Sequence, residues 1–176
     1  MVIYTKKGDK DETCLFGNKK TSKSSLIINA VGTIDELNSY LGVAVSFSER
    51  MELNGVLKQI QKDLLTIGSI LSGSNLAFSK SKTTSLEKII DEIEKRLPSL
   101  KFFIIPGGSK VTPHLHFARS LARRSERAIV ALDKKDKVKP QILSYLNRLS
   151  DLLFMLARKA NWELGMEEEK WESGEF

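Results

Sequence analysis

The stretch HFARSLARRSERAIVAL, residues 116–132, combines a helical apolar pattern with four arginines and one glutamate. At about 100° per residue, its small and apolar side chains fall on one side of a helix that we expect from Pro113 to Leu132. Arg119, Arg123 and Glu126 lie at the edge of this apolar stripe, so the charges border the expected core. The stripe consists of Ala118, Leu121, Ala122, Ser125, Ala128, Ile129 and Leu132.

A second long helix, expected from Pro140 to about Gly165, repeats this arrangement. Its apolar stripe is Ile142, Leu146, Leu149, Leu153, Leu156 and Ala160. Beside that stripe run Asn147, Asp151, Phe154 and Arg158, at helical spacing. Two helices in succession therefore carry arginine, amide and carboxylate groups next to an apolar seam.

Periodicity alone leaves two interpretations of these flanks open. In the first, they are solvated helix edges, where attraction between Arg123 and Glu126 or repulsion between Arg123 and Arg127 amounts to only roughly tenths of a kcal/mol. In the second, they hold phosphate, because the planar guanidinium fork offers paired donors that match phosphate oxygens.

The rest of the chain favours an all-α, up-and-down bundle of five helices. Further helices are expected from Thr33, as N-cap, to about Phe47, over residues 53–71 and over residues 86–97. We interpret the Ser-, Lys- and Thr-rich stretch that ends at Thr84 as a flexible loop, and Pro106-Gly107-Gly108-Ser109 as a tight turn. We expect one domain over residues 1–176, with an arm (1–30), a bundle (31–165) and a tail (166–176).

The first 30 residues look unlike the remainder and read as an ordered arm. Short β-prone pieces at residues 2–4 and 26–28 suggest a strand pair. Glycine, lysines and hydroxyl groups in one loop make a plausible phosphate cradle, although the G-x-x-x-x-G-K-[ST] spacing is missing. The residues concerned are Thr5, Gly8, Asp9, Lys10, Thr13, Lys19, Lys20, Ser22 and Lys23.

Composition limits the class of protein. Of 176 residues, 41% are hydrophobic and 28% charged, which supplies a core and argues against disorder. No apolar run approaches the roughly 18 residues of a membrane span, and the N-terminus lacks the apolar segment of a signal peptide. Cys14 is the one cysteine, which suits a reducing compartment, and we expect a cytoplasmic protein. His114 and His116 diverge by about 200° on a helix and are not expected to share a metal.

Three blocks of the sequence, taken together, resemble one known family. They are TKKGDKDETCLFGNKKTSKSS with AVGTIDELNSYLG, then IPGGS with LHFARSLARRSER, and finally YLNRLSDLLFMLAR. In this order they are similar to the PduO-type ATP:corrinoid adenosyltransferases, whose bundle is ferritin-like. The sequence departs from the family pattern at Lys7 and Asp11, where the family has Thr and Gly, and at residues 110–114, KVTPH. A glycine with positive φ at position 11 would make Asp11 a strained residue.

The resemblance implies that the enzyme transfers the 5′-deoxyadenosyl group of ATP to the cobalt of cob(I)alamin, with Mg²⁺ and base-off cobalamin. It implies a homotrimer with active sites between subunits, in which Asp35 pairs with Arg119 of a neighbour and Phe103 packs under the corrin. A reductase or a B12-dependent mutase would be a partner protein. The arm would wrap ATP through Thr5, Gly8, Asp9, Lys10, Thr13, Lys20, Ser22 and Lys23. Arg119, Arg123, Glu126 and Asn147 would hold the triphosphate, the magnesium ion and the ribose or adenine.

Two other functions stay open on the residues. A homologue that binds nucleotide or corrinoid without turnover is suggested by Lys7 and Asp11. A basic helical module that binds nucleic acid is suggested by the net charge of +6. Against the second, the arginines flank an apolar seam, and no aromatic residues alternate with them as stacking platforms. We therefore expect neither a nucleic-acid nor a membrane partner.

Overall fold

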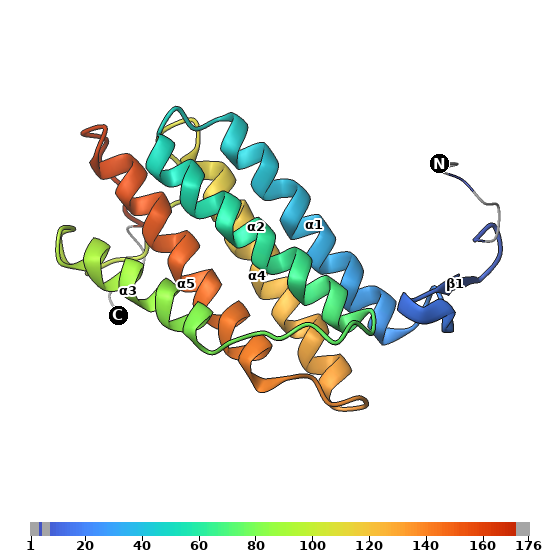
Figure 1. Ribbon diagram of the computed structural model, residues 1–176. Coiled ribbons are helices and arrows are strands. Elements are labelled where there is room, and N and C mark those ends of the chain that lie inside the picture. The colour runs from blue at the N-terminus through green and yellow to red at the C-terminus, as the bar shows by residue number, and fades with distance from the viewer. Residues whose placement is uncertain (1–3, 5–7, 172–176) are drawn as a thin grey trace.

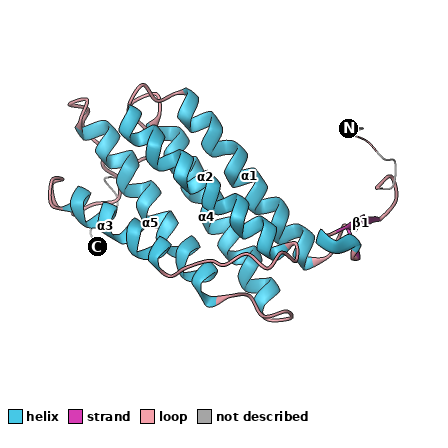
Figure 2. Ribbon diagram, in the orientation of Figure 1, coloured by secondary structure: helices cyan, strands magenta, loops and turns pink. Residues whose placement is uncertain are grey.

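The protein is a bundle of five helices with a small two-stranded sheet at one end (Figures 1 and 2). This computed structural model describes Tyr4 and residues 8–171. The all-α, five-helix prediction is confirmed, and successive helices run in alternating directions (Figure 1). The helices are α1 (Leu26–Ser46), α2 (Met51–Leu71), α3 (Ser81–Glu94), α4 (Thr112–Asp133) and α5 (Pro140–Trp162).

The core lies between α1, α2, α4 and α5, and α3 packs on the outside of α5. Helix α4 is central, because it packs against α1 on one side and against α5 on the other. The apolar stripes predicted for α4 and α5 are buried, as periodicity indicated. The edges of those stripes consequently lie beside the α4–α5 seam.

Two helices begin earlier than their sequences suggested. Helix α1 starts at Leu26, because the side chain of Ser25 caps it by accepting a hydrogen bond from the Ile28 amide at 3.5 Å. Thr33, predicted as the cap, is buried inside the helix and donates to the Ala30 carbonyl at 2.9 Å. Helix α3 starts at Ser81 and takes up part of the predicted loop.

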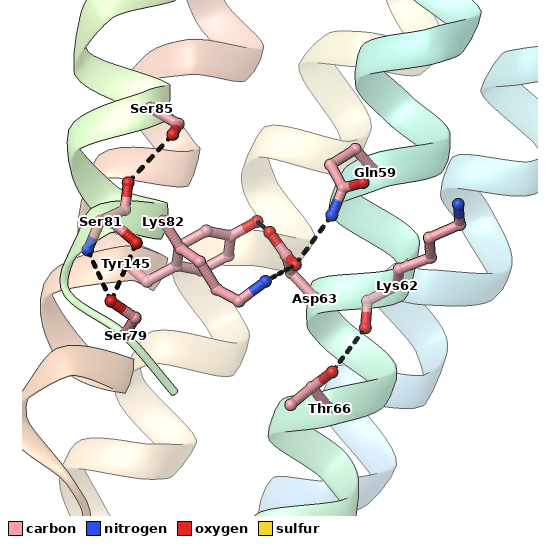
Figure 3. Close-up of polar contacts among 9 residues, drawn as sticks. All are labelled: Gln59, Lys62, Asp63, Thr66, Ser79, Ser81, Lys82, Ser85 and Tyr145. Carbon is pink, nitrogen blue, oxygen red and sulfur yellow. Dashed lines mark hydrogen bonds and ion pairs between the residues drawn. The ribbon is translucent and has the colours of Figure 1, made fainter. Parts of the chain in front are cut away.

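The early start of α3 brings Lys82 to a buried carboxylate (Figure 3). Asp63 on α2 is only 5% exposed and pairs with Lys82. It also accepts hydrogen bonds from the Tyr145 hydroxyl at 3.0 Å and from the Gln59 amide at 3.1 Å. Burial, with Asp63 nearby, raises the pKa of Tyr145, so this hydroxyl remains a donor. The cluster joins α2, α3 and α5.

The strand pair is present in the arm but not where it was predicted. Strand β1 (Glu12–Cys14) pairs antiparallel with β2 (Lys20–Ser22), in a register that sets Thr13 opposite Thr21. Residues 26–28 belong to the first turn of α1 instead, where Ser25 caps the helix and Ile27 packs against the core. Residues 2 and 3 of the other predicted piece lie outside the described residues.

Candidate functional site

Three arginines gather in a groove between α3, α4 and α5, which we call the arginine groove. It has a volume of about 310 Å³. Arg119 and Arg123 come from α4, and Arg148 comes from α5. The remaining lining residues are Ile90, Glu94, Ser150, Asp151, Phe154 and Met155. The groove thus combines cationic side chains with apolar walls.

Arg119 is the least solvated of these arginines. Its Nε is buried and has no hydrogen-bond partner among the described residues. Burial, and then the charge of Arg123, lowers the pKa of the Arg119 guanidinium. Because arginine stays charged at neutral pH, two adjacent guanidinium groups here favour a bound anion. An unpartnered buried donor beside a second cation is therefore the chemical signature of this groove.

Glu126 and Asn147 extend the same face of the bundle beyond Arg123. The Asn147 amide donates to Glu126 Oε1 at 2.9 Å, which links α4 to α5. The structure therefore brings together four of the predicted ligand residues, Arg119, Arg123, Glu126 and Asn147, on one side of the α4–α5 pair. Their roles toward a nucleotide stay predictions.

Arg148 was not among the predicted site residues, and Arg158 lies elsewhere than predicted. Arg148 donates to Glu87 on α3 at 3.3 Å and to Asp151 at 2.6 Å. Arg158, predicted beside the α5 stripe, is buried and bonds both carboxylate oxygens of Glu168 at 3.1 Å, away from the groove. The side chain of Arg148 reaches α3, a helix distant in sequence, so periodicity within α5 gave no indication of it.

His116 lies one helical turn before Arg119 and is 4% exposed. Its ring contacts Phe154, a residue of the groove wall, with centroids 5.9 Å apart. Burial, and then the charge of Arg119, lowers its pKa to about 4, so the imidazole is neutral at neutral pH. His114 instead bonds the Tyr40 hydroxyl at 2.8 Å. The two rings have separate surroundings, and no cluster of three metal-ligating side chains occurs in the described part of the chain.

A second groove lies on the other side of the molecule, between the arm, α1 and α2. We call it the arm groove, and its volume is about 810 Å³. Thr13 of β1 and Asp35 and Asn38 of α1 contribute polar groups to it, and Phe16 contributes an exposed aromatic ring. The side-chain oxygen of Asn38 is buried and unpartnered within the described residues. Like the arginine groove, the arm groove therefore contains a buried polar atom that has no hydrogen-bond partner among the described residues.

The arm is fixed by its own hydrogen bonds. The Lys23 amide donates to the Asp11 carbonyl at 2.8 Å, and the Lys23 ammonium donates to the Gly8 carbonyl. Asn18 is the one non-glycine residue with positive φ in the described chain, so the strain expected at Asp11 is absent. The other predicted arm residues are exposed, namely Asp9, Lys10, Lys19, Lys20 and Ser22, and Thr5 lies outside the described residues.

Asp35 and Arg119 belong to different grooves and do not meet within one chain. The side of α4 that faces α1 is occupied, because Ser125 donates to the Thr33 carbonyl at 2.9 Å and Arg124 pairs with Glu36. Arg119 points to the opposite side of α4, toward α5 and α3. A pair between Asp35 and Arg119 consequently requires a second copy of the chain.

Phe103 lies 53% exposed on the segment that leads into the Pro106-Gly107-Gly108 turn. That turn is held by Asn161 of α5, whose side chain accepts from the Ser109 amide at 2.9 Å and donates to the Gly107 carbonyl at 3.0 Å. Gly108 has a φ of +113°, and a Cβ there would lie 2.2 Å from Asn161 Oδ1. The predicted tight turn is confirmed, and Asn161, which sequence reasoning missed, anchors it.

Fold and site together define a helical-bundle protein with a cationic groove on one side and a strand-paired arm beside a second groove. The family described as cobalamin adenosyltransferase matches residues 3–160 of the sequence. The chain belongs to this cobalamin adenosyltransferase family.

Individual relatives agree with this assignment. The chain is 39% identical to a corrinoid adenosyltransferase of Bacillus subtilis, over 98% of this chain and 93% of that protein. It is 38% identical to the corrinoid adenosyltransferase PduO of Citrobacter freundii, over 90% of this chain but only 49% of that protein.

A solved structure has the same fold. It is a variant of the PduO-type ATP:corrinoid adenosyltransferase of Lactobacillus reuteri complexed with cobalamin and ATP. The two chains superpose with a TM-score of 0.94 at 33% identity, covering 98% of this chain and 97% of that one. No described helix of the present protein is sufficiently long and apolar to span a membrane.

Proposed function

We propose that this protein transfers the 5′-deoxyadenosyl group of ATP to the cobalt of cobalamin, giving adenosylcobalamin and triphosphate. The observation that carries the proposal is the pair Arg119 and Arg123 in the arginine groove, with the buried Arg119 Nε unpartnered among the described residues. In a poorly solvated groove such donors interact with an anion more strongly than at an open surface. The triphosphate of ATP is the ligand that this arrangement fits.

The protein's task is to position the reactants and to neutralise charge. Cobalt in its +1 state is itself the nucleophile: it attacks the 5′ carbon of ATP, and triphosphate leaves with the bonding electrons. Arg119 and Arg123 stabilise the charge that grows on the leaving group. No protein nucleophile is needed for this reaction.

Glu126 and Asn147 complete the nucleotide side of the site. Magnesium bound to ATP takes one or two protein carboxylates beside the phosphate oxygens. Glu126 suits this task, because the 2.9 Å hydrogen bond from Asn147 fixes the orientation of its carboxylate. Asn147 is also available to the ribose or adenine.

The complete site lies between two subunits of a homotrimer. Each chain contributes its arginine groove to one interface and its arm groove, with Thr13 and Asp35, to the next. Asp35 of one subunit pairs with the Arg119 guanidinium of the other and fixes its orientation toward the nucleotide. The arm residues Thr5, Gly8, Asp9, Lys10, Lys20, Ser22 and Lys23 then close over the nucleotide.

Phe103 forms the corrin side of the site. Its exposed ring packs under the corrin and excludes the lower axial ligand. Removal of that ligand favours reduction of Co(II), because the oxidised state loses a donor. A reductase supplies the electron, a B12-dependent mutase receives the product, and the reaction takes place in the cytoplasm.

Anaerobic mixing with ATP, magnesium and chemically reduced cobalamin tests the activity. The absorbance spectrum of the corrinoid should change to that of adenosylcobalamin, in proportion to enzyme and time. A spectrum that changes only on binding, without turnover, would instead identify a non-catalytic homologue. A steep salt dependence of nucleic-acid binding, with no effect on corrinoid, would favour the nucleic-acid alternative.

A further inference from the structure

Residues 166–171, which we call the C-terminal strap, pair with the segment that carries Phe103. After α5 the chain turns at Gly165, whose φ is +65°, and runs back antiparallel to residues 103–105. The Ile105 amide donates to the Glu169 carbonyl at 2.8 Å, and the Trp171 amide donates to the Phe103 carbonyl at 2.9 Å. The strap thereby supplies the strand partner of the Phe103 segment.

Side chains alternate between the two faces of this small ladder. Phe102, Ile104 and Lys170 line a cavity of about 610 Å³ on one face. Phe103 and Trp171 do not line it, and their rings contact each other with centroids 6.0 Å apart. The ring proposed to meet the corrin is therefore supported from within the chain by the strap.

The strap is not held by dense packing, because the cavity lies between it and residues 97–102. Besides the backbone hydrogen bonds of the ladder, an ion pair attaches the strap to α5. The Arg158 Nε donates to both carboxylate oxygens of Glu168 at 3.1 Å, and the same guanidinium donates to the Pro98 carbonyl at 3.1 Å. Arg158 is 7% exposed and Glu168 22% exposed, so water weakens this pair less than a surface pair.

We propose that the C-terminal strap sets the position of Phe103 and that the Arg158–Glu168 ion pair latches the strap. Glu168 is then a positioning residue, which acts on the reaction through Phe103 and touches neither substrate. The inference rests on the role proposed for Phe103 above. It assigns a function to Arg158 and to the C-terminal strap, neither of which has a role in the proposed binding of the nucleotide.

Hydrogen–deuterium exchange on the full chain tests the latch directly. In Glu168→Ala, the amides of Ile105 and Trp171 should exchange about tenfold faster, because the ladder opens more often without the ion pair. Core amides such as that of Leu146 should be unaffected. Glu167→Ala is the matched control: its side chain is exposed on the same strap and forms no ion pair with a described residue. Equal exchange in Glu168→Ala and Glu167→Ala would overturn the latch.

Turnover tests the consequence for Phe103. Glu168→Ala should lower the rate that starts from Co(II) several-fold more than the rate that starts from pre-reduced Co(I). Glu168→Gln should restore part of the Co(II) rate, because its amide oxygen still accepts from Arg158. Faster exchange with an unchanged Co(II)-to-Co(I) ratio would overturn the positioning role.

Phe103→Ala, measured in parallel, separates this inference from the proposed function. If Phe103→Ala changes the Co(II)-to-Co(I) ratio and Glu168→Ala does not, the strap does not position Phe103. If Phe103→Ala leaves the ratio unchanged, the role proposed for Phe103 is wrong, and the exchange rates alone decide on the latch.

Discussion

Arg119 is the residue on which the nucleotide chemistry most depends, because it is the groove arginine whose Nε is buried and whose guanidinium pKa is lowered by burial. We expect Arg119→Ala to lower kcat/KM for ATP by about 10²–10³, the loss typical of one preorganised donor. Arg119→Lys should recover little of this loss, because an ammonium cannot offer two planar donors. Steady-state rates with pre-reduced cobalamin measure the effect.

Arg96 provides the control for that experiment. It is an exposed arginine after α3 that does not line the arginine groove. Arg96→Ala removes the same charge and should stay within about twofold of the wild-type rate. A rate for Arg119→Ala as high as that of Arg96→Ala would contradict the role of Arg119.

His116 makes stability depend on pH, because its folded-state pKa is about 4 whereas the unfolded value is near 6.5. The unfolded chain therefore binds a proton on this ring between pH 6.5 and 4 that the folded chain does not. Stability from this group is complete above pH 6.5 and falls as the pH drops toward 4. Between pH 7 and 5, the free energy of unfolding should fall by about 2 kcal/mol more in the wild type than in His116→Gln. Urea unfolding at both pH values measures the difference, and equal falls would show that the ring is solvated.

At the scale of elements, the Pro106-Gly107-Gly108 turn joins the Phe103 segment to α4. Gly108→Ala should lower the free energy of unfolding by about 2–4 kcal/mol, because the residue has positive φ and its Cβ would overlap the Asn161 side chain. Gly107→Ala is a matched control, since the nearest atom to its Cβ would be 3.9 Å away. Thermal denaturation of both variants checks this, and equal melting temperatures would refute the need for glycine at position 108.

The sequence predicted some helices more completely than others. Helices α4 and α5 have long apolar stripes, so a period of 3.6 residues predicted their buried faces, and it predicted their bounds to within three residues. The starts of α1 and α3 were not predicted, because residue propensity suggested a strand at the first and a loop at the second. In the structure, the side chains of Ser25 and Ser79 accept hydrogen bonds from backbone amides in the first turns of these helices.

The candidate site was predictable only in part, because some of its residues are positioned by contacts between distant segments of the chain. Arg119 and Arg123 were indicated because both lie beside the stripe of a single helix. Arg148 is positioned by its contact with Glu87 on α3, and the strap is positioned by its hydrogen bonds to residues 103–105. Such contacts join residues that are about 60 positions apart, and no local pattern in the sequence encodes them.

At the scale of the whole molecule, the two grooves lie on different sides of one chain, and neither holds all the predicted ligand residues. Arg119→Ala damages the arginine groove and leaves the arm groove intact, whereas Asp35→Ala does the reverse. If the active site forms between subunits, a mixed trimer contains some interfaces built from two undamaged grooves. Each variant alone contains none.

Subunit mixing therefore tests the architecture independently of any single rate. When equal amounts of Arg119→Ala and Asp35→Ala are unfolded together and refolded, random assembly should make about one interface in four fully intact. The mixture should then recover about a quarter of the wild-type turnover, although each variant refolded alone has little. Two samples refolded separately and then combined form the control, since exchange of subunits is required. Activity that equals the average of the two variants would place every ligand residue in one chain, and the arginine groove would then have to bind ATP without a neighbour's Asp35.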